Sequence, residues 1–310
     1  MNTDRRKSVF RTSILIATVV LSSWAIFGQN ITQGVPQPLP PGKNLATTLV
    51  NSFQEQKLAS KLMGRDMPYR IILPTLYNKA NETARYPVIF LLHGLTGHYT
   101  NWTDKTKLNQ YAVVHNFIIV TPEGDNGWYT DSVSTPNDKY ESYIMQELIP
   151  EIDKKYRTVA DREHRMIAGL SMGGFGAIKF GLKYPDKFSL VGGFSGALGA
   201  AGWTEKNAGA IAKSMDAIFG ADEGSESRKA NDIFRLVREM TPDKQSGLPY
   251  FYQSCGTEDF LIANNRDFLK LLNEKKIPHE YREHPGVHDW VFWDDQVREF
   301  LDVAERRLKK

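Results

Sequence analysis

Short apolar runs alternate along the chain with longer amphipathic segments. The apolar runs are typical of strands that are covered on both faces of a sheet, and they lie at residues 86–92, 117–120, 166–168 and 188–194. The segments between them have the spacing of helices, at residues 108–115, 140–156 and from 175 to about 184. This β-α-β-α-β order predicts an α/β fold with a mostly parallel, doubly wound sheet.

Further elements are expected on either side of this central series. Residues 54–62 and 67–73 alternate like two antiparallel strands, and Pro150 is expected to kink the helix at 140–156. After residue 247, the pattern predicts two strands and two helices, at residues 250–254, 264–273, 279–282 and 289–308. Between residues 196 and 247 the pattern loosens into small-residue turns and two helices, at about residues 208–219 and 227–240, and we interpret this stretch as a helical cap insertion over a pocket.

Charge is concentrated at the start of the chain. The formal net charge of the 310 residues is +3. Residues 1–28 carry four basic residues and one acidic residue, Asp4, so this segment accounts for the whole net charge. The remainder holds 35 basic and 35 acidic residues (39 − 4 and 36 − 1) and is neutral. A nucleic-acid-binding domain is expected to keep a basic surface once folded, so the composition argues against a nucleic-acid partner.

The first 28 residues resemble a secretory signal peptide. A basic stretch precedes an uncharged run of about 15 residues, which is shorter than the ~20 that a membrane span needs. We therefore expect a secreted or periplasmic protein with no stable membrane span after processing; an uncleaved anchor is the alternative. Residues 29–44 are rich in proline and predict an extended linker, and residues 45–310 are expected to form the folded α/β domain.

The candidate chemistry begins at Ser171. It lies between Gly169 and Gly173, where a predicted strand meets a predicted helix, and this is the setting of a nucleophile elbow. A serine at such a turn is also a good N-cap for the following helix, so the motif alone leaves both interpretations open. A catalytic role needs a base, an acid and oxyanion donors elsewhere in the chain.

Three other predicted strand ends supply these groups. In a parallel sheet the carboxyl ends of the strands meet at one edge, which brings the turns after residues 92, 254 and 282 beside Ser171. Asp259 and His288 follow in the order Ser, Asp, His that an α/β-hydrolase uses. Glu258 is the alternative acid and His284 the alternative base. The backbone N–H groups of Met172 and Leu95 are the expected oxyanion donors.

Two other kinds of site do not fit the spacing. His279 and His284 are five residues apart, so they do not share a helix face as the histidines of a zinc protease do. The glycines after Ser171 lack the acidic residue of a dinucleotide fingerprint. We predict neither a metal nor a cofactor. Cys255 is the only cysteine, which excludes an intramolecular disulfide, and we expect it to be buried packing.

These residues resemble the esterase D-like branch of the α/β-hydrolases, which includes tributyrin and feruloyl esterases, S-formylglutathione hydrolases and mycolyltransferases. The resemblance runs from about Tyr69 to Phe300. The blocks that carry it are Leu91-Leu92-His93-Gly94, Gly124-Asp125-Asn126-Gly127-Trp128-Tyr129, Ala168-Gly169-Leu170-Ser171-Met172-Gly173-Gly174, Gly256-Thr257-Glu258-Asp259 and His288-Asp289-Trp290 with Trp293.

The resemblance implies a role for each matched position. Ser171, Asp259 and His288 take the places of the catalytic triad, and Leu95 and Met172 those of the oxyanion hole. Trp128 and Tyr129 take the places of residues that line the substrate pocket.

The expected activity is that of an exported serine carboxylesterase acting on a small-molecule or carbohydrate-linked ester. An acyltransferase that uses a sugar or lipid alcohol and an S-formylglutathione hydrolase-like thioesterase are the alternatives, and a non-catalytic binding module is a third. Leu170 and the signal peptide argue against the thioesterase, whose relatives carry histidine before the serine and are cytosolic. The pattern defines no oligomeric state.

Overall fold

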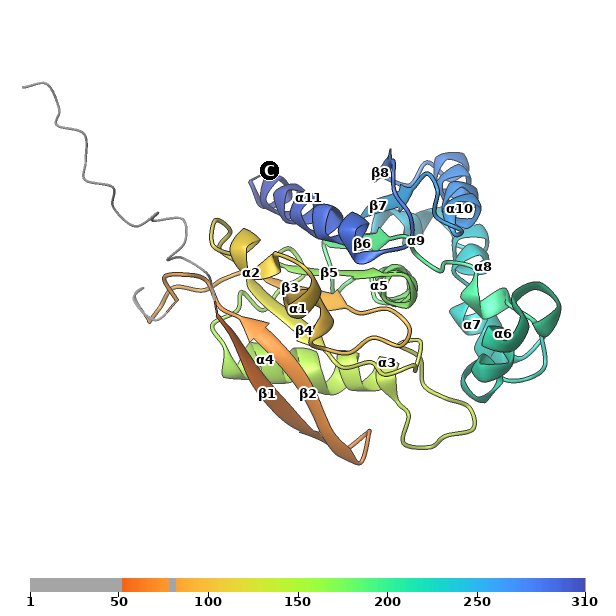
Figure 1. The fold of residues 1–310 in the computed structure, drawn as a ribbon, viewed down its shortest axis with the longest axis horizontal. Helices are drawn as coiled ribbons and strands as arrows, with labels where there is room; N and C mark the ends of the chain where they lie inside the picture. The colour runs from red at the N-terminus through yellow and green to blue at the C-terminus, as the bar shows by residue number, and fades with distance from the viewer. Residues whose placement is uncertain (1–51, 78–81, 310) are drawn as a thin grey trace, which may run out of the picture. The chain divides into compact units, whose positions relative to one another are not determined.

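The computed structural model describes residues 52–77 and 82–309 (Figure 1). The predicted signal peptide and the linker at residues 29–44 lie outside these ranges. Among the helices within them, none combines the length and the apolar character that crossing a membrane requires.

An eight-stranded sheet forms the centre of the described part of the chain. Its strand order is β1-β2-β4-β3-β5-β6-β7-β8, and all pairs from β4 to β8 are parallel. Only β2 runs against the other strands, since it pairs antiparallel with both of its neighbours. The predicted α/β fold is confirmed. The strands are β1 (Phe53–Ser60), β2 (Arg65–Ile72), β3 (Val88–Leu92), β4 (Ile118–Pro122), β5 (Arg165–Leu170), β6 (Leu190–Phe194), β7 (Tyr250–Gly256) and β8 (His279–His284).

Helices cover both faces of this sheet. Apolar side chains of α4, α5 and α10 pack against one face, and those of α1, α2 and α11 pack against the other. Figure 1 shows the sheet between α11 on one side and α4 on the other. Because both faces are covered, β3, β4, β5 and β6 are buried along their whole length, as their apolar runs predict. The helices named here are α1 (Asn101–Lys105), α2 (Leu108–Tyr111), α4 (Ile149–Lys155), α5 (Met172–Lys183), α10 (Ile262–Glu274) and α11 (Trp290–Leu308).

The helix predicted at residues 140–156 is made of three parts, and the middle one differs from the others in helical geometry. It begins as α3 (Tyr140–Ser142), continues as a π-helix, η2 (Tyr143–Leu148), and ends as α4. Pro150 comes just after the π-helical turns, and the backbone is helical at Leu148 and Ile149, so the helix continues through the proline. The helix is therefore irregular next to Pro150, where the sequence predicts a kink, and the irregularity takes the form of π-helical turns.

A helical segment separates β6 from β7, within residues 196–247. Its first long helix, α6, contains Gly209 with a positive φ of 57°, so the backbone bends there. The predicted helix at 227–240 is two short helices, because Asp232 is extended and caps the second of them. The elements are η3 (Ala200–Gly202), α6 (Glu205–Phe219), α7 (Glu226–Asn231), α8 (Ile233–Arg238) and α9 (Pro242–Ser246).

Candidate active site

The loops after β3, β5, β7 and β8 meet at one pocket of about 430 Å³. Ser171 and His288 both line it, as do Leu95 and Trp128. Four tryptophans contribute to its wall, from the loop before α3, the segment before α6 and the start of α11. The lining residues include Leu95, Trp128, Ser171, Trp203, Phe260, His288, Trp290 and Trp293.

Ser171 occupies a strained turn between β5 and α5. Its φ of 52° and ψ of −114° are rare for a residue with a side chain. The flanking glycines allow the turn, because a Cβ on Gly169 would lie 2.4 Å from the carbonyl carbon of Gly173. A Cβ on Gly173 would in turn lie 2.4 Å from the carbonyl oxygen of Leu92. The local sequence thus holds the serine hydroxyl at the edge of the sheet, as a nucleophile elbow does.

A chain of hydrogen bonds joins Ser171, His288 and Asp259. Nε2 of His288 lies 3.0 Å from Oγ of Ser171, and Nδ1 lies 2.8 Å from Oδ2 of Asp259. The other carboxylate oxygen of Asp259 accepts the N–H of Leu261 at 2.8 Å. Burial opposes ionisation of Asp259, but hydrogen bonds from His288 and Leu261 outweigh it and hold the pKa of Asp259 below its usual range. The arrangement can therefore move a proton from the serine hydroxyl to an imidazole steadied by a carboxylate.

The alternative acid and base lie elsewhere. Glu258 is exposed, and its Oε2 accepts the N–H of Gly286 at 2.7 Å, which fixes the loop that carries His288. His284 is the last residue of β8, lines a different cavity, and its Nε2 lies 3.6 Å from Glu299. Cys255 is fully buried in β7, and burial with the nearby charge of Asp259 raises the pKa of its thiol to about 12. A thiol with that pKa is not a nucleophile at neutral pH.

The two predicted oxyanion donors are backbone N–H groups near Ser171. Met172 is the first residue of α5, where N–H groups have no helical partner and the helix dipole favours negative charge. Leu95 follows the Gly94 turn and lines the pocket. Within residues 52–77 and 82–309, neither of these two N–H groups makes a hydrogen bond. Both are therefore available to a developing oxyanion.

Glu123, which the sequence does not single out, holds the loop after β3. This carboxylate follows β4 and is almost fully buried, with its Oε1 2.9 Å from Nε2 of His93. It also accepts the N–H of Asp125 at 2.8 Å and that of Tyr99 at 3.3 Å. Burial opposes its ionisation, yet these hydrogen bonds lower the pKa of Glu123 to about 2. A charged Glu123 thus fixes His93, whose Nδ1 contacts the carbonyl of Gly94, next to Leu95.

Trp128 and Tyr129 point in different directions. Both residues have a left-handed backbone, with φ of 51° and 50°. Trp128 lines the pocket and packs edge to face on Trp203, with ring centroids 5.7 Å apart. Tyr129 is fully buried, and its hydroxyl donates to the carbonyl of His93 at 3.0 Å. The structure therefore does not place Tyr129 in the pocket wall as predicted, because the left-handed turn directs its ring into the core, where it supports the His93 loop.

A buried ion pair that includes a lysine of α5 contacts the residues that follow Trp128 and stabilises this loop. Nζ of Lys179, which is fully buried in α5, donates to the carbonyl of Tyr129 and the hydroxyl of Thr130, each at 2.7 Å. The same nitrogen lies 2.8 Å from Oε2 of Glu141, which also pairs with Lys183. Burial lowers the pKa of Lys179 to about 8, and the two lysines lower that of Glu141 to about 2 in spite of its burial. The pair is thus charged at neutral pH and ties the strained loop to α5.

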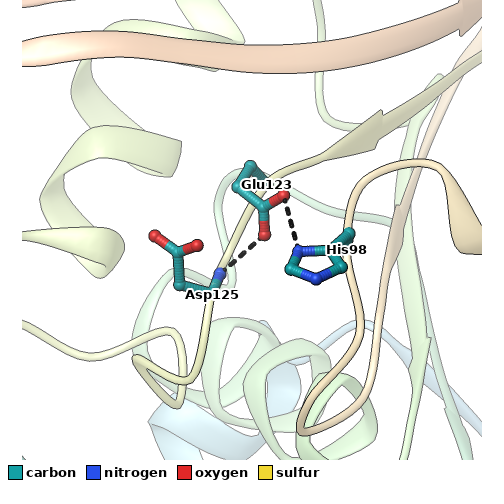
Figure 2. Close-up of side chains that lie close together, drawn as sticks. All are labelled: His98, Glu123 and Asp125. Atoms are coloured by element: carbon teal, nitrogen blue, oxygen red, sulfur yellow. Dashed lines mark hydrogen bonds and ion pairs between the residues drawn. The ribbon is translucent and has the colours of Figure 1, made fainter.

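One further cluster resembles a cation site by geometry. His98, Glu123 and Asp125 each have a possible ligand atom, and these atoms lie within 4.8 Å of one another (Figure 2). The carboxylates are already used by protein donors, since Glu123 accepts the N–H groups described above and Asp125 pairs with Arg65 at 3.2 Å. His279 and His284 are the two ends of a strand, β8. We assign no metal to either set.

The strand order and the strained serine between β5 and α5 are those of an α/β-hydrolase. The family model described as "Putative esterase" matches residues 60–301. The chain belongs to this esterase family and is a carboxylic ester hydrolase, which confirms the predicted resemblance.

Three similar proteins show how far the likeness extends. An acetyl esterase of Caldicellulosiruptor saccharolyticus is 30% identical over 248 residues, which cover 77% of this chain and 92% of that protein. A ferulic acid esterase of known structure is 28% identical, covers 84% of this chain and 99% of its own, and has a TM-score of 0.71. A fluorophosphonate-binding serine hydrolase of Staphylococcus aureus is 25% identical. The match covers 82% of this chain and 98% of that one, with a TM-score of 0.71.

Proposed function

We propose that the protein is an exported serine carboxylesterase that cleaves acyl esters through an acyl-enzyme on Ser171. The observation that carries the proposal is the hydrogen-bonded series from Ser171 through His288 to Asp259, with its serine end open to the pocket. Three similar proteins support the proposal: a serine hydrolase that binds fluorophosphonates, an acetyl esterase and a ferulic acid esterase.

In the proposed mechanism, His288 moves the protons while the other groups stabilise the charges that form. Nε2 of His288 accepts the proton of Ser171 as Oγ bonds to the acyl carbon, and Asp259 stabilises the resulting imidazolium. The N–H groups of Leu95 and Met172 stabilise the oxyanion, each contributing about 3 kcal/mol to the barrier reduction. His288 then returns the proton to the leaving alcohol. A water that His288 deprotonates attacks the acyl-enzyme, and Ser171 leaves with its proton restored.

The pocket favours small acyl groups. Its volume of about 430 Å³ is near the lower end of the range for ligand sites, and Trp128 and Trp203 pack on each other in its wall. We expect kcat/KM for p-nitrophenyl acetate or butyrate to exceed that for the laurate ester at least ~10-fold.

A panel of acetyl, butyryl, lauroyl and feruloyl esters with the purified protein measures this preference. A preference for laurate would contradict the small pocket and favour a lipid substrate. Excess sugar or lipid alcohol in the same assay tests the alternative acyltransferase: new ester product in place of free acid would support it.

We also propose that the chain is exported. The support is the basic start and the uncharged run of about 15 residues in residues 1–28. We expect the N-terminal sequence of the protein recovered from the periplasm or culture fluid to begin near residue 29. Recovery of the uncut chain in the membrane fraction would contradict cleavage and support an uncleaved anchor.

A further inference from the structure

A buried serine, Ser195, follows the strand next to that of Ser171 and also has a positive φ. Leu170 and Phe194 are paired at the ends of β5 and β6, and a serine with a positive φ follows each of them. The φ of Ser195 is 48°, close to the 52° of Ser171. Glycine is the residue that adopts this region without cost, so a serine here indicates that its side chain is needed.

The hydroxyl of Ser195 connects two parts of the site. It accepts a hydrogen bond from Nε1 of Trp293 at 3.2 Å. Its interaction with the carboxylate of Asp259 is one of the contacts that lower the pKa of that group, and the buried thiol of Cys255 is a second neighbour. The backbone N–H of Ser195 donates to the carbonyl of Ser254 at 2.7 Å, which anchors it to the end of β7, the strand that leads to Asp259. The residue is fully buried, so water does not compete for these contacts.

Trp293 contacts the imidazole that Asp259 orients. Its ring meets that of His288 edge to face, with centroids 4.9 Å apart and an interplanar angle of 88°. Phe260 packs on His288 as well, with ring centroids 4.5 Å apart, but it is 74% exposed. Trp293 is therefore the buried neighbour that contacts both His288 and Ser195.

We propose that Ser195 and Trp293 form a positioning pair that fixes the Asp259 carboxylate and, through it, the direction of the His288 imidazole. This inference rests on the proposed function. Trp293 holds the Ser195 hydroxyl in place by donating to it, so that the hydroxyl proton is directed at Asp259. Without that donor the carboxylate keeps its hydrogen bonds with Leu261 and His288 but loses the contact with Ser195, and His288 spends less time aligned with Ser171. Small misplacements of this kind lower the rate of the chemical step more than substrate binding.

The variant that tests the pair most cleanly is Ser195→Gly. Glycine keeps the left-handed backbone without strain and removes the CH2OH side chain, so we expect kcat to fall about 10- to 100-fold while KM stays within about 2-fold. Relief of backbone strain opposes the loss of the buried hydrogen bond from Trp293, so the urea midpoint of unfolding should change little. Ser254→Ala is the matched control: its buried hydroxyl has no partner within the described ranges, and full activity is expected.

A double-mutant cycle separates positioning from a general packing role. If Ser195 acts through Asp259, adding Ser195→Gly to the Asp259→Asn variant should lower kcat less than about 3-fold, a smaller loss than in the wild type. Trp293→Phe keeps the ring against His288 and removes the N–H, and it should lower kcat about 3- to 10-fold even if Ser195→Gly does not fold.

Two results would contradict the proposed positioning role. One is a kcat of Ser195→Gly within 2-fold of the wild type. The other is an equal loss of kcat from Ser195→Gly in the wild-type and Asp259→Asn backgrounds. Full activity of Asp259→Asn alone would instead contradict the proposed function.

Discussion

Replacement of Ser171 by alanine should lower kcat for p-nitrophenyl acetate by at least ~10⁴-fold, because the Ser171 hydroxyl is the pocket group hydrogen-bonded to Nε2 of His288. The residual activity would come from the oxyanion donors and substrate binding. The fold should be preserved, since the Ser171 hydroxyl contacts His288 and alanine takes the strained backbone as serine does. We expect the free energy of unfolding to change by less than about 1 kcal/mol.

Kinetics and urea unfolding of Ser171→Ala, measured beside Ser254→Ala, check this expectation. The control removes a buried serine hydroxyl from the end of β7 and should keep full activity. Turnover by Ser171→Ala within 10-fold of the wild type would contradict the serine mechanism.

Asp259→Asn should have an effect of similar size, about 10⁴-fold on kcat. An amide in this position has no charge to stabilise the imidazolium of His288, and it favours the wrong imidazole tautomer. Glu258→Gln provides the comparison, because Glu258 is the neighbouring carboxylate and is exposed, with its Oε2 accepting the N–H of Gly286. We expect less than a 10-fold loss from it. A larger loss from Glu258→Gln than from Asp259→Asn would transfer the acid role to Glu258.

The stability of Asp259→Asn should also depend on pH differently from that of the wild type. The pKa of Asp259 in the folded protein is below its usual value, so the ionised group stabilises the fold above the usual carboxylate pKa of about 3.9, and this contribution is lost as the pH falls through the folded pKa. Asp259→Asn lacks this titration. Its urea midpoint should therefore fall less steeply than that of the wild type between pH 5 and 3. Equal slopes for the two proteins would show that the native environment does not favour the charged form.

The sheet and the serine turn can be predicted from sequence because their causes are local. The apolar runs mark strands buried on both faces, and Gly169 and Gly173 lie at fixed distances from Ser171 in the chain. The positions of Asp259 and His288 follow from the same rule of strand ends.

Other parts of the site depend on contacts between distant residues. Glu123 is a single carboxylate after a strand, and its partner His93 lies 30 positions earlier, so no spacing reveals it. Lys179 lies on the buried side of α5 because Glu141 neutralises it from another element. Tyr129 follows Trp128 in the chain, yet the left-handed backbone sends it into the core. Ser195 has no motif; only its φ and its partners make it notable.

The most direct test of the central claim is labelling with a fluorophosphonate followed by mass spectrometry of the digested protein. The probe forms a stable adduct with a serine that a neighbouring imidazole activates. We predict a single adduct on the peptide that contains Ser171, and none on the Ser171→Ala variant. An adduct on another residue, or a labelled Ser171→Ala variant, would contradict the assignment of Ser171 as the nucleophile.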